Sequence, residues 1–203
     1  MKLILESEKL ENYLHESRVV NYSHESIQET ADRLFPTSLS EVEKAVIAFE
    51  FVRDEIYHSW DIQGKVVTCK ASDVLAYKQG ICYAKANALA ALLRLQGIPT
   101  GFCYQRLMLF DVPEKGYCIH ALNAVFLRTT NRWVRLDARG NKLGVDARFS
   151  LKEERLAFSP QTEMGEIDYP LVYTAPHPQT ITVLQENTDA LEMYQRGLPE
   201  RLP

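Results

Sequence analysis

Residues 80–99 read Gly-Ile-Cys-Tyr-Ala-Lys-Ala-Asn-Ala-Leu-Ala-Ala-Leu-Leu-Arg-Leu-Gln-Gly-Ile-Pro, and this stretch decides the fold. From Cys82 onward it consists almost entirely of strong helix formers, and Gly97 and Pro99 predict where the helix ends. Apolar residues occupy nearly every side of the predicted helix, so we expect it to be buried through the middle of the domain.

The segments around this helix predict an α+β fold. The expected elements, in chain order, are helices at about 23–35 and 40–58, a β-like stretch at 66–68, helical turns at 71–78, strands at 100–110, 119–127 and 132–138, and a last helix near 181–194. The second helix has the best-marked start, because Ser40 and Glu43 form a capping box. Helices that precede a set of antiparallel strands are typical of the α+β class.

Length and composition bound the possible functions. A chain of 203 residues with 46% hydrophobic and 25% charged residues fits one domain, residues 1–203, with a core at about 40–140. Residues 1–39 would form a helical extension, and residues 159–203 a wrapping tail with a final helix. The net charge is −4 and acids and bases are interleaved, so nucleic acid is a poor partner.

No apolar stretch approaches the length that crosses a membrane, and the first residues lack the apolar core of an export signal. We therefore expect a cytoplasmic protein that binds no membrane and keeps its four cysteines reduced. The sequence does not predict the oligomeric state.

Cys82 is the candidate nucleophile. It stands where a glycine-broken turn enters the buried helix, and the first N–H groups of a helix stabilise a thiolate. The Cys82 N–H would also receive an oxyanion, and Gly80 would leave room for a substrate. The alternative is a small apolar residue packed at a helix start. Cys69, Cys103 and Cys118 lie in strands or connections, away from any predicted helix start.

His120 is the candidate base, because it alone among the five histidines lies in a strongly apolar strand. His58 is expected to end a helix as a cation. If the strands at 119–127 and 132–138 turn at residues 129–130, Leu122 lies opposite Asp137. His120 is then the diagonal neighbour of Asp137 on the same face of the sheet. Asp137 would then orient the imidazole. The alternatives are a hydrogen-bonded core histidine and an Asp137 that pairs with Arg135, Arg139 or Arg148.

These motifs resemble those of the transglutaminase-like superfamily. The resemblance covers roughly residues 40–140 and rests on residues 71–84, on Leu-Leu-Arg-Leu-Gln-Gly-Ile-Pro at 92–99, on the His120 strand and on Arg-Trp-Val-Arg-Leu-Asp at 132–137. It implies a papain-like fold, with the buried helix packed on an antiparallel sheet, and a triad of Cys82, His120 and Asp137. It also implies an upstream aromatic or amide donor to the oxyanion, for which Trp60, Tyr77 and Gln79 are candidates.

The chain departs from the family pattern at three points, and these concern the substrate more than the triad. Leu122 stands where many relatives have an aromatic residue, Asp137 is followed by Ala-Arg-Gly-Asn, and no cluster of acids suggests a calcium site.

The predicted reaction is acyl chemistry on an amide or peptide carbonyl through a thioester, with hydrolysis favoured over transfer to an amine. The substrate would be a peptide, a protein or a small amide, and no cofactor or metal is expected. Related triads also serve acetyl-transferring and glycan-amidase enzymes. A non-enzymatic binding module is a further alternative. A zinc site of Cys82, Cys103, Cys118 and His120 is disfavoured because no Cys-x-x-Cys knuckle is present.

Overall fold

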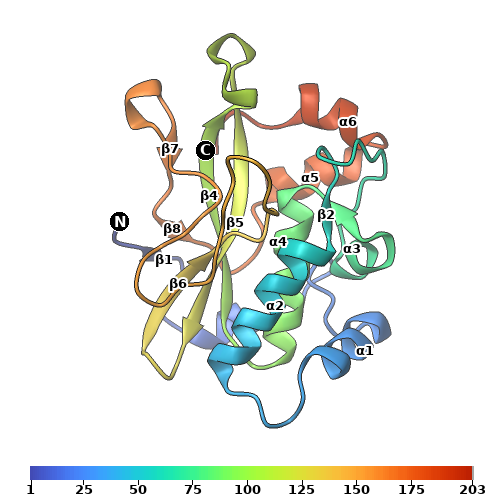
Figure 1. Ribbon diagram of the computed structural model, residues 1–203, viewed down its shortest axis with the longest axis vertical. Coiled ribbons are helices and arrows are strands. Elements are labelled where there is room, and N and C mark those ends of the chain that lie inside the picture. The colour runs from blue at the N-terminus through green and yellow to red at the C-terminus, as the bar shows by residue number, and fades with distance from the viewer. Residues whose placement is uncertain (203) are drawn as a thin grey trace.

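Helix α4 (Cys82–Leu95) runs through the middle of the molecule, and every residue from Cys82 to Arg94 is buried. The computed structural model describes residues 1–202 and has the predicted α+β architecture, with helices on one side and a curled sheet on the other (Figure 1). Leu89 and Leu92 of α4 pack with Phe49 and Val52 in one large core cluster. This burial is what the all-round apolar sequence of the helix predicts.

The helical elements agree with most of the sequence predictions. The α-helices are α1 (Glu25–Leu34), α2 (Glu41–Glu55), α3 (Ala71–Tyr77), α4, α5 (Pro178–Glu186) and α6 (Ala190–Glu192). Short 3-10 segments are η1 (Leu10–Tyr13), η2 (Leu109–Asp111), η3 (Pro113–Lys115) and η4 (Thr162–Met164), and η5 (Met193–Gly197) has π-helical bonding. The predicted capping box starts α2: the Glu43 N–H donates to Ser40 Oγ at 3.3 Å, and the Ser40 N–H donates to Glu43 Oε2 at 2.8 Å.

The main sheet has four antiparallel strands in the order β6-β5-β4-β7. Its strands are β4 (Thr100–Met108), β5 (Tyr117–Leu127), β6 (Arg132–Leu136) and β7 (Ile167–Asp168). Asn123 lies opposite Leu136 and Leu127 opposite Arg132, which is the predicted register. Because a slip of one residue would reverse every side chain, this register decides what Asp137 meets beyond the end of β6.

Two short parallel pairs were not predicted. β1 (Ile4–Leu5) pairs with β8 (Leu171–Val172), and β2 (Tyr57–His58) pairs with β3 (Gln79–Gly80). Two local predictions are wrong. Residues 66–68 form no strand, and the helix expected near 181–194 is divided between α5 and α6, since Asp189 caps a new helix start.

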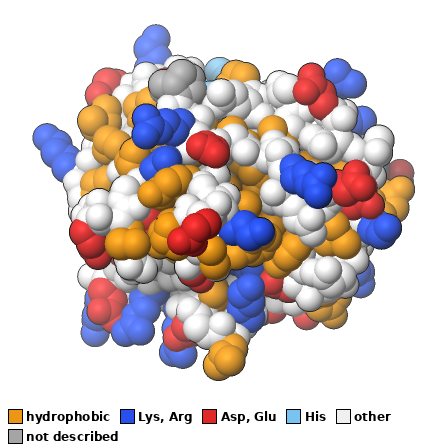
Figure 2. Space-filling view, turned by 90° about the horizontal axis from the view of Figure 1, so that it is seen from above, with side chains coloured by type: hydrophobic (Ala, Val, Ile, Leu, Met, Phe, Trp, Pro, Cys, Tyr) orange, Lys and Arg blue, Asp and Glu red, His pale blue; other side chains and the backbone are white. Residues whose placement is uncertain are grey.

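A second, smaller core cluster lies apart from the one around α4. It contains Tyr13, Cys103, Leu122, Ala124 and Val172, so the N-terminal segment and β8 help to cover the sheet. On the face in Figure 2, charged side chains of both signs alternate with hydrophobic ones. Within residues 1–202, no helix combines the length and apolar character needed to cross a bilayer.

Candidate active site

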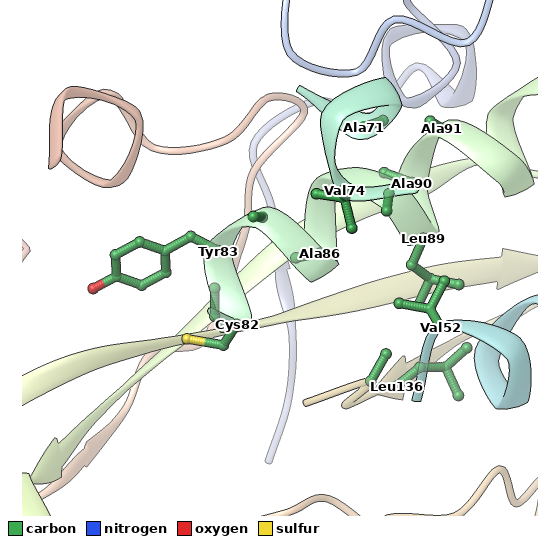
Figure 3. Close-up of a cluster of buried hydrophobic side chains, with 14 of the residues drawn as sticks. Val52, Ala71, Val74, Cys82, Tyr83, Ala86, Leu89, Ala90, Ala91 and Leu136 are labelled. Carbon is green, nitrogen blue, oxygen red and sulfur yellow. The ribbon is translucent and has the colours of Figure 1, made fainter. Parts of the chain in front are cut away.

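Cys82 is the first residue of α4, and the start of this helix has no side-chain cap. Ile81 occupies the N-cap position, where Ser40 and Asp189 cap other helices with an oxygen atom. The sulfur of Cys82 points away from the packed cluster that the rest of the helix joins (Figure 3). The free N–H groups and the helix dipole therefore favour negative charge at this sulfur.

His120 and Asp137 meet as the strand register predicts. Nε2 of His120 lies 2.8 Å from Oδ2 of Asp137, and the two side chains are almost completely buried. The backbone N–H groups of Arg139 and Ala157 also donate to this carboxylate, at 3.2 and 3.1 Å. Asp137 is thus held in one orientation, and the hydrogen bond to Nε2 leaves Nδ1 of His120 to exchange a proton with a thiol.

The pKa values of this pair are shifted toward the charged forms. Burial lowers the pKa of His120, but the Asp137 carboxylate and the neighbouring Cys82 sulfur raise it more, to about 10. Burial raises the pKa of Asp137, but His120 and the two backbone N–H donors outweigh burial and lower it. Cys82 contributes to the raised pKa of His120, and both residues line the same cavity.

The arginines near Asp137 pair with other acids. Arg135 binds Glu154 and Asp168, and Arg148 binds Asp146. The guanidinium of Arg139 binds Asp61, which Lys142 also contacts at 3.0 Å. His120 therefore supplies the ionic partner of the Asp137 carboxylate.

A cavity of about 430 Å³ joins these groups to the surface, and both Cys82 and His120 line it. Trp60 lines it as well. Among the described residues, the other two candidate donors lie outside the cavity lining: Tyr77 is 60% exposed, and the Gln79 amide donates to the Val66 carbonyl.

Gly80 has a different role from the one expected. A Cβ at this position would come within 2.8 Å of Thr68 Oγ1 and 3.0 Å of Ala84 Cβ. The space beside Gly80 is filled by protein, so packing, and not substrate access, requires the glycine.

Three aromatic rings from distant segments gather at the cavity. Trp60 stacks on Tyr194 with ring centroids 5.0 Å apart, and Phe110 lies 5.0 Å from Trp60 and 5.9 Å from Tyr194. Tyr194 belongs to η5, so the C-terminal segment returns to complete the wall of the cavity. No pattern near Tyr194 in the sequence could have predicted this placement.

His58 is the residue at this site that the sequence prediction misplaced. Helix α2 ends at Glu55, and His58 lies beyond it on β2, 4% exposed and in the cavity lining. Burial, Arg139 and Lys85 lower the pKa of His58 well below its ordinary value, so the ring is neutral. The expected cation at a helix end is therefore wrong, since the interior and two nearby cations disfavour a charge there.

The fold and this arrangement agree with a comparison against known families. The model of the transglutaminase-like superfamily matches residues 28–138, which is more than half of the chain. The chain belongs to the transglutaminase-like superfamily. No curated protein matches its sequence.

Two solved structures are similar to this superfamily member. One, described as a "Putative Cysteine Protease from Cytophaga hutchinsonii", is 18% identical with a TM-score of 0.52, and the match covers 66% of this chain and 43% of that one. Another, described as a "TGase", is 15% identical with a TM-score of 0.43, and the match covers 96% of this chain and 52% of that one. The chain thus spans about half or less of their length. The first likeness supports the fold, and the family supports cysteine-based acyl chemistry in general.

Proposed function

We propose that the protein hydrolyses an amide or peptide bond through a thioester on Cys82. The observation that carries this proposal is the buried pair of His120 and Asp137, whose Nε2 and Oδ2 atoms lie 2.8 Å apart, together with the cavity that both His120 and Cys82 line. A structural cysteine would need neither a buried, oriented imidazole nor access to a cavity.

In the first half of the reaction the Cys82 thiolate attacks the carbonyl carbon, and the new S–C bond forms as the carbonyl π electrons move onto oxygen. The protonated His120 then gives its proton to the leaving nitrogen, the C–N bond breaks and an amine departs. Until His120 gives up this proton, Asp137 stabilises the positive charge of its imidazolium.

In the second half a water molecule attacks the thioester while His120 takes its proton. The C–S bond breaks, the acid is released and Cys82 recovers its thiolate beside the imidazolium. An amine in place of water would give acyl transfer by the same steps. Water is the simpler acceptor, and we favour hydrolysis for this reason.

Part of the cavity wall is apolar, and we expect the acyl group to occupy that part. Leu107, Leu109, Phe110 and Phe158 all line the cavity, and Phe158 also packs edge-on against His120 at 5.1 Å. Phenylacetyl esters should therefore acylate the protein faster than acetyl esters with the same leaving group. Equal rates for the two esters would contradict this part of the proposal.

The substrate is a peptide, a protein or a small amide, and we place the protein in the cytoplasm, where thiols stay reduced. Cell fractionation tests the location. Recovery of the protein outside the cytoplasm would contradict it.

Thiol alkylation tests the nucleophile directly. Burial raises the pKa of the other thiols, to about 11 for Cys69 and to about 12 for Cys103 and Cys118. Iodoacetamide at about pH 6.5 should modify Cys82 at least ~10-fold faster than these three, as followed by peptide mass spectrometry. His120→Ala should lower the rate of modification of Cys82 at least ~10-fold, while Cys69→Ala, outside the cavity, should leave that rate unchanged.

Acyl transfer to the sulfur is tested with p-nitrophenyl acetate. The wild type should release one equivalent of nitrophenolate in a burst, followed by slower turnover, and Cys82→Ala should show no burst. Turnover that requires an added amine would assign the protein to acyl transfer. Equal alkylation of all four cysteines, or the absence of a burst, would overturn the proposal in favour of a binding module.

A further inference from the structure

A second histidine stands at the cavity without a role in the steps above. His58 on β2 lies opposite Gly80 on β3, and the next residues after Gly80 begin α4. The Ser59 N–H donates to the Gly80 carbonyl at 3.2 Å, which fixes the two segments together. The backbone therefore holds His58 beside the start of α4, close to Cys82.

The imidazole of His58 has no polar partner. In residues 1–202, neither of its ring nitrogens hydrogen-bonds to another group, and its Nδ1 is completely buried. In the part of the chain that the structure describes, four other buried side-chain atoms lack partners too, on Ser59, Asn87, Gln105 and Asn123, but those residues do not line the cavity. An unpaired buried polar atom costs about 1–3 kcal/mol, so a free imidazole beside a cavity needs an explanation.

Packing orients the ring in place of hydrogen bonds. His58 lies edge-to-face on Tyr194, with centroids 5.7 Å apart and an interplanar angle of 88°. Tyr194 is held in turn by its stack on Trp60. The ring is thus fixed in orientation without a hydrogen bond to Nε2.

The charge state and the tautomer of His58 suit a hydrogen-bond donor. The neutral ring carries one N–H, because burial first, and then the neighbouring Arg139, Lys85, His120 and Lys142, lower the pKa of His58. Nδ1 is enclosed by protein without a partner, so Nε2 is the ring nitrogen that can meet a molecule in the cavity. The tautomer that makes His58 a donor to such a molecule carries its proton on Nε2.

We propose that His58 donates its Nε2–H to the carbonyl oxygen under attack by Cys82, together with the uncapped backbone N–H of Cys82. The inference rests on the proposed function, and it assigns His58 as a catalytic residue that stabilises the oxyanion. No proton is transferred at His58: the carbonyl π electrons move to oxygen, the hydrogen bond shortens, and the ring stays neutral throughout.

The candidates named from sequence are less suited to this role. The Gln79 amide is already engaged by Val66, and Tyr77 points to solvent. Trp60 lines the cavity, but its ring is held in the stack with Tyr194 and Phe110. The indole N–H of Trp60 is therefore the competitor that the experiment must separate from His58.

Two reactions of the Cys82 sulfur distinguish stabilisation of the oxyanion from a general effect on the reactivity of the thiol. Alkylation by iodoacetamide forms no oxyanion, whereas acylation by p-nitrophenyl acetate does. In His58→Ala we expect acylation to fall ~10²–10³-fold while alkylation of Cys82 changes less than about threefold. His58→Gln, whose amide nitrogen falls near the position of Nε2, should recover at least about tenfold of the lost acylation rate. His58→Asn, whose amide nitrogen falls near Nδ1, should not.

Tyr57→Phe on the exposed side of the same strand is the matched control and should leave both rates unchanged. Thermal melting shows whether each variant is folded. If His58→Ala does not fold, the acylation rates of His58→Gln and His58→Asn are compared instead. Three results would overturn the inference: equal falls in both reactions, unchanged acylation, or a loss found in Trp60→Phe and not in the His58 variants. A wild type that is never acylated would sink the proposed function itself, whereas an acylated wild type with indifferent His58 variants would sink this inference alone.

Discussion

The two ends of helix α4 are built differently. At the C-terminal end, the guanidinium of Arg94 is buried and donates to the carbonyls of His15, Thr100 and Thr174 at 2.6 to 3.1 Å. One side chain thereby joins the N-terminal segment, β4 and the segment after β8 to the helix. Its polar groups are paired, and this end contributes to stability.

At the N-terminal end, polar groups are left without partners. The first turn has no side-chain cap, and the ring of His58 forms no hydrogen bond within the described residues. Lys85, one turn into the helix, is buried as well, although its ammonium donates to backbone carbonyls at the end of α2. Such features weaken the folded state, and they persist where a bound ligand can satisfy them. The difference between the ends separates the part of the helix that holds the fold together from the part that we assign to chemistry.

The largest expected effect on the reaction comes from substituting Asp137, which binds His120 near the N-terminal end of α4. Asp137→Asn retains the shape but no longer fixes the tautomer of His120 or stabilises its charged form. The rate of acylation by p-nitrophenyl acetate should fall about 10³–10⁴-fold. Stopped-flow measurement of nitrophenolate release tests this, with the exposed Asp146→Asn as the control. A rate within threefold of the wild type would mean that Asp137 does not act through His120.

The next effect breaks the C-terminal end. Arg94→Leu leaves the buried carbonyl of Thr100 and the part-buried carbonyls of His15 and Thr174 without their donor, and the free energy of unfolding should fall by about 3–5 kcal/mol. Urea unfolding measures the loss. Arg128→Leu is the matched control, because Arg128 also donates to a carbonyl at this end, that of Gly97, but is half-exposed. In the folded fraction Cys82 should be alkylated at the wild-type rate, and a slower rate would show that the two ends are coupled.

Lys85 sharpens the comparison through pH. Its ammonium donates to the Ile56 and Arg53 carbonyls at the end of α2, and burial, with help from Arg139, lowers the pKa of Lys85 to about 7. The unfolded chain keeps this proton up to about pH 10.4, so between about pH 7 and 10 it binds more protons than the folded chain does. The stability of the wild type relative to Lys85→Met should therefore rise across this range, by a few kcal/mol at most.

Urea unfolding of both proteins at about pH 7 and 9.5 measures this difference. His120 contributes the opposite trend, because its raised pKa gives stability that is lost as pH rises toward about 10. That contribution is present in both proteins and cancels in the comparison. The control is Lys44→Met. Lys44 belongs to α2, is partly exposed and binds Gln96 at the C-terminal end of α4. Parallel pH curves for the wild type and Lys85→Met would show that the buried charge does not titrate.

The sequence predicted the parts of the site that depend on local structure. The helix from Cys82 follows from helix propensity and from the residues that end it, Gly97 and Pro99. The pairing of His120 with Asp137 follows from a two-residue turn and from the alternation of side chains along a strand. Both are statements about neighbours along the chain or across one hairpin. Neither prediction required knowledge of how distant segments of the chain pack.

The parts that were missed depend on distant contacts. His58 looks like the end of a helix until β2 pairs with β3, and only that pairing brings it to the cavity. Tyr194 comes from the far end of the chain, and the role of Gly80 depends on its contact with Thr68. Residues 66–68 have strand-forming side chains but pair with no neighbouring strand, so tertiary context overrides their propensity.

The smallest effect concerns the start of α2, which lies beside the C-terminal end of α4 through the contact of Lys44 with Gln96. Ser40→Ala removes the capping box and should lower the free energy of unfolding by about 1 kcal/mol. Ser38→Ala, at an exposed position before the cap, is the control. The rates of Cys82 alkylation and acylation should not change, because the altered cap lies at the structural end of the helix pair. If Ser40→Ala slowed either reaction as much as it lowered stability, the separation of the two ends would not hold.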